Sequence, residues 1–338
     1  MTLATWAVGA TVSSDVGNSW LKIPSSTRNA AMGEALGAVP DATDAVDINP
    51  AGLGVLRGIR LSLAQNFWAQ DISIQHFTYG SGFADGEGIA LGADCVNFGK
   101  IPLYHEVGSS VVSDGNYSPM GLNLYGGYGM KLSPGLFGGV AAHLIYDNTQ
   151  KASEGSTGAI DVGLMGISSG AHLSGSAVLS NVGGKLNDEK LPSQLKTAVA
   201  YRFEFPKNEG SKDGMVLAAE GDWGMADTAK SAAGFGAEYC FAEVLSLQCG
   251  YRVKTMKDIE GLKGFSCGVG FERKFWGFNY AMTTIGDFGK AHQIELNFKW
   301  GDKGDKPKTV RSDEEITVHK AKGSNEVVRH RGSRSDQE

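Results

Sequence analysis

Apolar and polar residues alternate with a period of two along most of the chain from residue 59 to residue 300. In the last such run, Ile294 and Leu296 share one face while Glu295 and Asn297 share the other. Successive side chains of a β-strand point to opposite faces, so this alternation is typical of strands with one apolar and one polar face. The chain is therefore predicted to be all-β over this range.

The alternation predicts fourteen strands, and an even number of antiparallel strands suits a closed barrel. Most are about 9–11 residues long, or slightly longer, which is the length that crosses a bilayer obliquely. The predicted fold is a 14-stranded antiparallel transmembrane β-barrel. The runs lie at 59–68, 71–80, 88–98, 119–132, 136–147, 157–167, 170–180, 194–206, 214–224, 231–241, 244–254, 263–272, 275–284 and 291–300.

The connections between these runs mostly alternate between short and long. The connections "SPG", "SS", "AEV" and "KFW" are tight, whereas "GKIPLYHEVGSSVVSDGNYS", "NTQKASEGS", "NVGGKLNDEKLPS", "TMKDIEGLKG" and "TIGDFGKA" are long and polar. Short turns on one side and longer loops on the other are typical of outer-membrane barrels. A soluble β-sandwich has no reason to sort its loops in this way. The first connection and "KNEGSKD" do not follow the rule.

Aromatic residues gather near the predicted strand ends. Amphipathic rings favour the membrane interface, and the alternative is that they cap an ordinary soluble core. The residues are Trp68, Tyr146, Phe205, Trp223, Trp276 and Trp300.

The composition agrees with a membrane barrel and excludes other classes. The sequence holds no apolar run of about 18 residues, so no helix is predicted to span a bilayer. The mean hydropathy of −0.17 fits strands that are half polar. There are 48 glycines, many inside alternating runs, and the formal net charge is −6. Without a basic patch, no nucleic-acid partner is expected, and membrane lipid is the expected surrounding.

The segment before the strands, from Arg28 to Leu53, is small, acidic and compatible with a helix. Asp41 follows Pro40 and is predicted to cap a short helix with Asp44 in its first turn.

The helix is expected to end at Asn49-Pro50, because the residue before proline is pushed out of the helical region. Ala51-Gly52 is expected to turn into the first strand. A barrel of fourteen strands is too wide for its own side chains to fill. Residues 19–58 are therefore predicted to form a small hatch that plugs the lumen.

The sequence "RNAAMGEALGAVPDATDAVDINPAGL" resembles the N-terminal hatch of the FadL superfamily of outer-membrane barrels, with its PorV/PorQ-like branch as the nearest pattern. That resemblance implies a hatch with gating residues Arg28, Met32, Gly33, Asp41, Asp44, Asn49, Pro50, Ala51 and Gly52. Ala30, Ala35 and Leu53 also match the pattern.

The resemblance implies two alternative functions. One is passage of hydrophobic, fatty-acid-like small molecules across the outer membrane, gated by a shift of the hatch near Asn49-Pro50. The other is a PorV-like part of type IX protein secretion, with secretion-machinery proteins as partners. A soluble all-β enzyme or carbohydrate-binding sandwich is the weakest alternative.

The two ends of the chain differ from the middle. Residues 1–18 are interpreted as the remnant of an export signal or as a flexible terminus. Residues 301–338 carry mixed charges and few apolar residues, which predicts a disordered tail. With both termini expected at the turn side, the tail would lie in the periplasm, either solvated or docking a partner.

Polar residues inside the strands are interpreted as a lumen lining around the plug, and no enzymatic activity, cofactor or metal is expected. The candidates are Arg202, Glu220, Asp222, Glu238, Arg252 and Glu272. The "GFSCG" around Ser266 matches a nucleophile elbow, but an elbow requires a strand followed by a helix. Cys249 and Cys267 are predicted on neighbouring strands, where a disulfide or two free thiols would fit.

Overall fold

The computed structural model describes most of the chain. The described residues are 19–39, 45–68, 71–83, 86–107, 110–150, 153–187, 189–206, 212–225, 231–254, 264–286 and 289–301. Asp41 and Asp44, the proposed export-signal remnant and the charged tail from residue 302 lie outside these ranges. Within them, no helix is long and apolar enough to cross a membrane.

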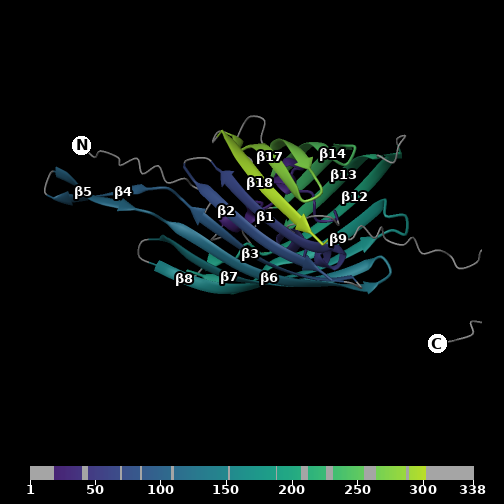
Figure 1. Cartoon of the computed structure of the whole chain (residues 1–338). Coiled ribbons are helices and arrows are strands. Elements are labelled where there is room, and N and C mark those ends of the chain that lie inside the picture. The colour runs from purple at the N-terminus through teal and green to yellow at the C-terminus, as the bar shows by residue number, and fades with distance from the viewer. Residues whose placement is uncertain are drawn as a thin grey trace, which may run out of the picture. The chain divides into compact units, whose positions relative to one another are not determined.

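Fourteen strands form a single closed antiparallel barrel, which confirms the predicted fold class (Figure 1). Neighbours along the chain pair with one another, and β1 closes the sheet against β18, where Ile59 lies opposite Trp300. The strands are β1 (Gly58–Phe67), β2 (Ser73–Gly82), β3 (Glu87–Asn97), β6 (Met120–Ser133), β7 (Leu136–Gln150), β8 (Ser153–Ile167), β9 (Leu173–Gly183), β12 (Gln194–Pro206), β13 (Lys212–Gly224), β14 (Ala232–Phe241), β15 (Leu245–Lys254), β16 (Phe265–Glu272), β17 (Trp276–Thr284) and β18 (Lys290–Trp300).

Three of the predicted long loops contain strands. The loop after β3 forms a hairpin of β4 (Ile101–Val107) and β5 (Ser110–Tyr117), which extends away from the barrel wall (Figure 1). The loop after β9 contains β10 (Lys185–Leu186) and β11 (Glu189–Lys190). The "NTQKASEGS" loop is largely taken up by extensions of β7 and β8, so that connection is tight. These segments were predicted as loops because the strands in them are polar and lack the alternation of apolar and polar residues on which the prediction depended.

The barrel has two distinct ends. The short turns after β6, β14 and β16 lie at one end, together with the start of β1 and the end of β18. We call this the short-turn end. The opposite end carries the β4–β5 hairpin and is called the hairpin end.

The outward faces of the strands are apolar and the inward faces are polar or small. Leu144, in the middle of β7, is 57% exposed, and Leu247, within β15, is 50% exposed. Glu295 and Gln248, on inward faces, are only 2% and 5% exposed. The alternation predicted from the sequence therefore places its apolar side chains on the outer surface.

Most of the predicted aromatic residues lie on the outer surface near a strand end. Phe205, Trp276 and Trp300 are exposed at the short-turn end, and Trp223 is exposed at the hairpin end. Trp68 is the exception, because it lines a small cavity inside the barrel.

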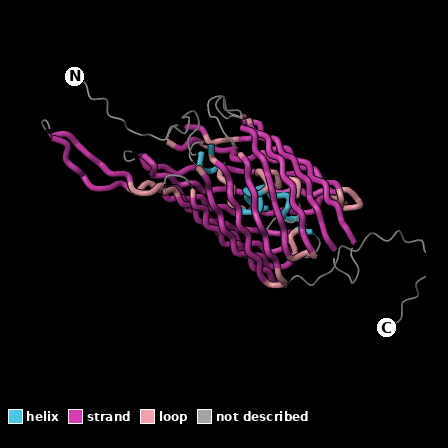
Figure 2. The backbone as a smooth tube through the Cα atoms, turned by 90° about the horizontal axis from the view of Figure 1, so that it is seen from above, coloured by secondary structure: helices cyan, strands magenta, loops and turns pink. Residues whose placement is uncertain are grey.

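The N-terminal segment, residues 19–39 and 45–56, lies inside the bore (Figure 2). It contains η1 (Ser19–Lys22), α1 (Thr27–Ala31), α2 (Ala45–Ile48) and η2 (Pro50–Val55). The helix α1 contacts β15 to β18, whereas η2 contacts β2, β3 and β6 to β8 on the other side of the bore. The segment therefore spans the width of the barrel.

The segment also runs along the length of the barrel. At the hairpin end, Trp20 Nε1 donates to Asp147 Oδ2 at 3.2 Å. At the short-turn end, Leu56 lies against Gly82. Ser19 and Trp300 thus lie at opposite ends of the barrel, and the expectation that both chain termini lie at the turn side stays a prediction, because both termini lie outside the described residues.

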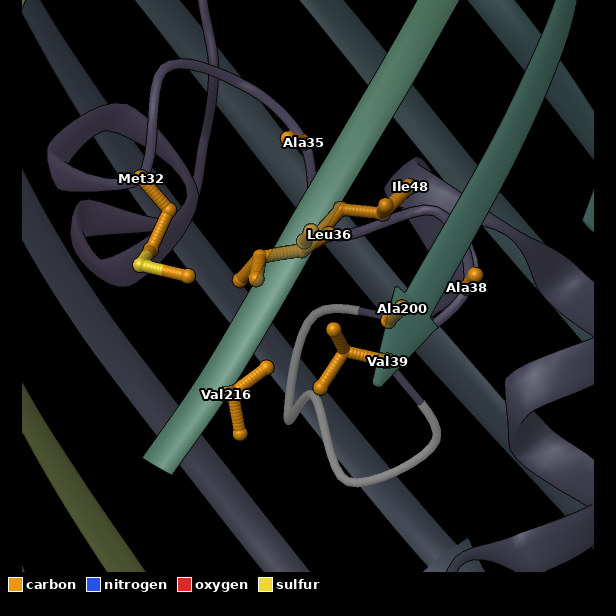
Figure 3. Packing of buried hydrophobic residues seen from close by; sticks show 9 residues of the cluster. Met32, Ala35, Leu36, Ala38, Val39, Ile48, Ala200 and Val216 are labelled. Carbon is orange, nitrogen blue, oxygen red and sulfur yellow. The ribbon is translucent and has the colours of Figure 1, made fainter. Parts of the chain in front are cut away.

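Apolar packing joins the segment to the wall. Met32, Leu36, Val39 and Ile48 form one buried cluster with small wall residues such as Ala200 (Figure 3). Alanines and a valine on the inward face of β12 and β13 leave the room that these larger side chains fill. The core of the molecule thus lies between the segment and the wall.

Short polar side chains fix the local turns of the segment. The Ser26 side chain accepts a bond from Asn29 N and caps α1. Asn49 follows the end of α2, as predicted, but Pro50 and Ala51 then begin the 3-10 helix η2 instead of a simple turn into β1. Proline suits the first helical position because its missing N–H would have no partner there.

Cys249 and Cys267 are direct partners in the β15–β16 register. Both are free thiols in this structure, as are Cys95 and Cys240. The disulfide between Cys249 and Cys267 stays a prediction.

Candidate functional site

Wall glycines receive the backbone of the Asn49-Pro50 turn. A Cβ at Gly129 would lie 2.5 Å from Pro50 O, and a Cβ at Gly139 would overlap the Pro50 carbonyl group. A Cβ at Gly163 would overlap Asn49 Oδ1. Only glycine allows so close an approach of two backbones, which explains several of the glycines inside apolar strands.

Gly33 is held in the same way on the opposite wall. Its φ of +66° is a left-handed conformation. A Cβ there would lie 2.7 Å from Phe235 O and 2.8 Å from Tyr251 N. Both its conformation and its surroundings therefore require glycine.

An ion pair ties α1 to the wall. The Arg28 guanidinium pairs with the Glu238 carboxylate, with Nε at 3.0 Å from Oε1. Gln248 Nε2 donates to the same carboxylate at 2.9 Å. Glu238 is buried, so its charge depends on these partners.

A second group of charges holds the turn after α1. Arg252 pairs with Asp222 on the wall and with Glu34 of the segment, where Nε lies 3.2 Å from Glu34 Oε2. Nearby, Gly37 N donates to Glu220 Oε2 at 2.9 Å.

The start of α1 is bound to β18. Thr27 N donates to Glu295 Oε2 at 2.9 Å, and Ser62 Oγ donates to the other oxygen of that carboxylate at 2.9 Å. Gln293 Nε2 donates to Ser25 O at 2.7 Å. These bonds attach α1 to the seam at which the barrel closes.

Ser266 also binds the segment. Its hydroxyl donates to Ala31 O at 2.9 Å and accepts from Gly33 N at 3.2 Å. The residue lies inside β16 with no helix after it, so the "GFSCG" match is not a nucleophile elbow.

Asn49 closes the segment on itself. Its Nδ2 donates to Gly37 O at 2.8 Å, and its Oδ1 accepts from Ala51 N at 3.1 Å. One side chain thus joins the two halves of the segment across the bore.

A buried polar network lies on the wall beside α2. Asp94 accepts from Asn123 Nδ2 at 3.1 Å and from Tyr125 OH at 3.2 Å, and its Oδ1 lies 2.9 Å from His76 Nδ1.

Within α2, the pKa of Asp47 is raised by burial and by the charge of Asp94. Ser25 Oγ donates to Asp47 Oδ2 at 2.6 Å, which opposes that rise.

A cavity of about 410 Å³ opens between α1 and the short-turn end. Three of the predicted lumen residues, Arg202, Glu238 and Glu272, line it. Glu272 is exposed and pairs with Lys299. Charges of both signs line this cavity.

The predicted residues that form or contact the segment are distributed as follows. Glu220, Asp222, Glu238 and Arg252 all belong to the contacts that hold the segment. Among the predicted hatch residues, Met32, Gly33, Asn49, Pro50, Ala51 and Gly52 are buried, and Arg28 is partly buried.

Several contact residues were not predicted. They include Glu295, Gln293, Ser266 and the wall glycines. All of them lie at the polar or small positions of the alternating strands, which face inward. This position in the alternation is the sequence feature that could have identified them. No group of His, Cys, Asp or Glu among the described residues is arranged to hold a metal ion.

No protein-family model matches the sequence, and no curated protein matches it. The structure is similar to the toluene transporter TodX of Pseudomonas putida, with a TM-score of 0.52 and 12% identity over 80% of this chain and 96% of that chain. It is similar to the toluene transporter TbuX of Ralstonia pickettii, with a TM-score of 0.52 and 14% identity over 81% of this chain and 98% of that chain. A FadL homologue of Pseudomonas aeruginosa has a TM-score of 0.48 and 8% identity over 82% and 99% of the two chains. The chain therefore has the fold of the two transporter barrels, with a bore occupied by its own N-terminal segment.

Proposed function

We propose that this protein is an outer-membrane barrel that passes hydrophobic small molecules across the membrane and is gated by its N-terminal segment. Two features together support the proposal: the outer surface of the barrel is apolar, and the N-terminal segment occupies the bore and is held there by hydrogen bonds and ion pairs to the wall. Such a segment closes the barrel at rest and must move before anything passes.

The apolar outer face supports membrane insertion. In water, exposed side chains such as Leu144 and Ile160 would form an apolar surface far larger than a soluble monomer carries. Hydrocarbon removes that cost, and the closed sheet leaves no backbone edge unpaired in lipid. The short turns suit the periplasmic side.

The contacts of α2 and η2 support passage of hydrophobic molecules near Asn49-Pro50. Val46 and Leu53 pack in a buried cluster with Ala90 and Ala141, and Ala51 packs near Phe137. A shift of η2 would expose these apolar surfaces to the bore. The toluene transporters that share the fold carry apolar solutes, which is the substrate class proposed here.

A matched pair of cysteines tests this gate. Val46 and Ala141 belong to one cluster, so V46C/A141C in a background without the four native cysteines should form a disulfide that fixes α2 to β7. We expect cells with the oxidised variant to lose uptake of labelled oleate or toluene and to regain it on reduction. Uptake that is equal with and without the protein would refute the proposal.

A second candidate function is docking of exported proteins, as in the PorV-like alternative. The β4–β5 hairpin favours it, because Tyr104 and Val111 are 62% and 67% exposed beyond the barrel wall. An unpaired hairpin edge can accept a strand from another protein. Deletion of residues 101–117 should then abolish co-purification of a stoichiometric partner without affecting oleate uptake. Co-purification that survives the deletion would count against this function.

A further inference from the structure

The helix α1 lies between two cavities of the bore. On its short-turn side, Ser26 and Arg28 face the cavity of about 410 Å³. On its other side, Ala30 and Gly33 face a cavity of about 20 Å³, which is room for about one water molecule.

One wall strand runs past α1 from the first cavity to the second. On β18, Asn297 lines the larger cavity and Gln293 lines the smaller one, with Glu295 between them. These three residues alternate along the strand and share its inward face. On β1, Arg60 and Asn66 occupy the corresponding positions. Polar side chains therefore follow the wall beside α1 from the first cavity to the second, next to the apolar contact of α1 with Ala281.

One polar atom of α1 and four of the wall are buried with no hydrogen-bond partner among the described residues. They are Thr27 Oγ1, Asn66 Oδ1, Gln248 Oε1, Gln293 Oε1 and Asn297 Oδ1.

The orientation of two of these amides is fixed by their partners. Gln248 donates its Nε2 hydrogens to the Glu238 carboxylate, and Gln293 donates to Ser25 O. The Glu238 carboxylate and Ser25 O can only accept hydrogen bonds, so the NH₂ group of each glutamine must face them. The amide oxygen of each glutamine therefore points away from these partners and has no donor among the described residues. A buried acceptor without a donor is costly unless water or a ligand supplies one.

We infer that the inner faces of β1 and β15 to β18 form a hydrated path for small neutral polyols, closed at rest by α1. The path rests on the membrane-barrel part of the proposed function and goes beyond the passage of hydrophobic molecules. Polyol hydroxyls donate hydrogen bonds to the free acceptors in place of water. Apolar solutes offer these acceptors no donor.

The path and the proposed hydrophobic gate use different parts of the segment. The wall beside η2 meets it through glycines and apolar clusters. The wall beside α1 also has glycine and alanine contacts with the segment, and it adds the charged contacts Arg28–Glu238 and Thr27–Glu295. Opening the polyol path requires α1 to leave these two carboxylates while η2 stays in place.

Glycerol entry into proteoliposomes tests the path, with two cysteine pairs in the background without native cysteines. Ala31 and Ala281 belong to one cluster beside α1, so A31C/A281C should lock α1 when oxidised. We expect oxidation to stop glycerol-driven swelling and reduction to restore it. V46C/A141C, which locks the other half, should leave swelling unchanged. Equal effects of both locks, or none from the α1 lock, would overturn the inference.

Arg28→Gln should raise the swelling rate roughly tenfold, as expected when one charged hydrogen-bonded contact that keeps α1 closed is lost. Asn66→Leu should slow glycerol entry in the Arg28→Gln background, because it removes an acceptor of the wall that has no hydrogen-bond partner among the described residues. Heat-modifiable gel migration and vesicle flotation verify folding and insertion of each variant. If the folded, inserted Arg28→Gln protein admits no glycerol, the path is refuted, whatever the result of oleate uptake.

Discussion

Asn49 and Gly37 are joined across the bore by a hydrogen bond of 2.8 Å from the Asn49 amide to the Gly37 carbonyl. They lie on the two halves of the N-terminal segment. Both halves pack against wall glycines, and the first half also carries the charged contacts of Arg28 and Glu34. This single bond therefore connects two differently anchored parts, and the same side chain caps η2.

Asn49→Ala should loosen the segment while leaving the barrel intact. It removes the bond to Gly37 and the cap on Ala51 N, which together correspond to about 1–3 kcal/mol. Hydrogen exchange of peptides covering residues 45–56 measures the effect. Asn97→Ala is the control, because Asn97 is exposed and its side chain accepts from the nearby Gly99 N as its one partner among the described residues. Equal protection in both variants would contradict the role given to Asn49.

Gly139→Ala should displace η2 from the wall. The added methyl group would overlap the Pro50 carbonyl, and overpacking of this kind costs about 1–3 kcal/mol. Gly166→Ala is the matched control on the neighbouring strand, since a Cβ there meets nothing within 4 Å. Protease cleavage near residue 50 should rise for Gly139→Ala alone. Similar cleavage of the two variants would argue against backbone contact at Gly139.

The seating of the segment should weaken as the pH rises, in part through Asp47. Burial and the charge of Asp94 raise the pKa of Asp47 above its ordinary value of 3.8. The seated state therefore binds the proton more tightly than the unseated state, and its stability falls as the pH rises from about that value through the raised pKa.

Asp47→Asn should remove this part of the pH dependence. Ser25, Asp94, Lys196 and His143 face the same carboxyl and stay in place in the variant. Hydrogen exchange of the segment at a series of pH values compares the two proteins. Parallel pH profiles for wild type and variant would rule out Asp47 as the titrating group.

A positive charge on the outer face should destabilise the barrel according to depth. Leu144→Arg, in the middle of β7, should cost about 2–4 kcal/mol, because it places a charge near the bilayer centre. Leu136→Arg, at the short-turn end of the same strand, should cost about 0–1 kcal/mol. Urea unfolding from lipid vesicles measures both. Equal costs would mean that the outer face does not contact hydrocarbon.

The strands and their facing were predictable, but the contacts of the bore were not. Alternation is local, so Glu295 could be assigned to the polar face of its strand from its neighbours alone. Its partner Thr27 is 268 residues away in the sequence, so the contact between them could not be predicted. The β4–β5 hairpin was predicted as a loop because a two-stranded sheet with both faces in water has no apolar phase to recognise. The roles of Asp41 and Asp44 in the segment stay predictions.

By itself, the sequence determined the all-β class, the fourteen strands and the face that each residue takes, because a period of two follows from strand geometry. It also determined the break at Asn49-Pro50, since proline restricts the residue before it. Only the tertiary structure decided which wall residues hold the segment. Closing the sheet brings β18 beside β1 and surrounds the segment with strands from the whole chain, and no local pattern encodes that arrangement.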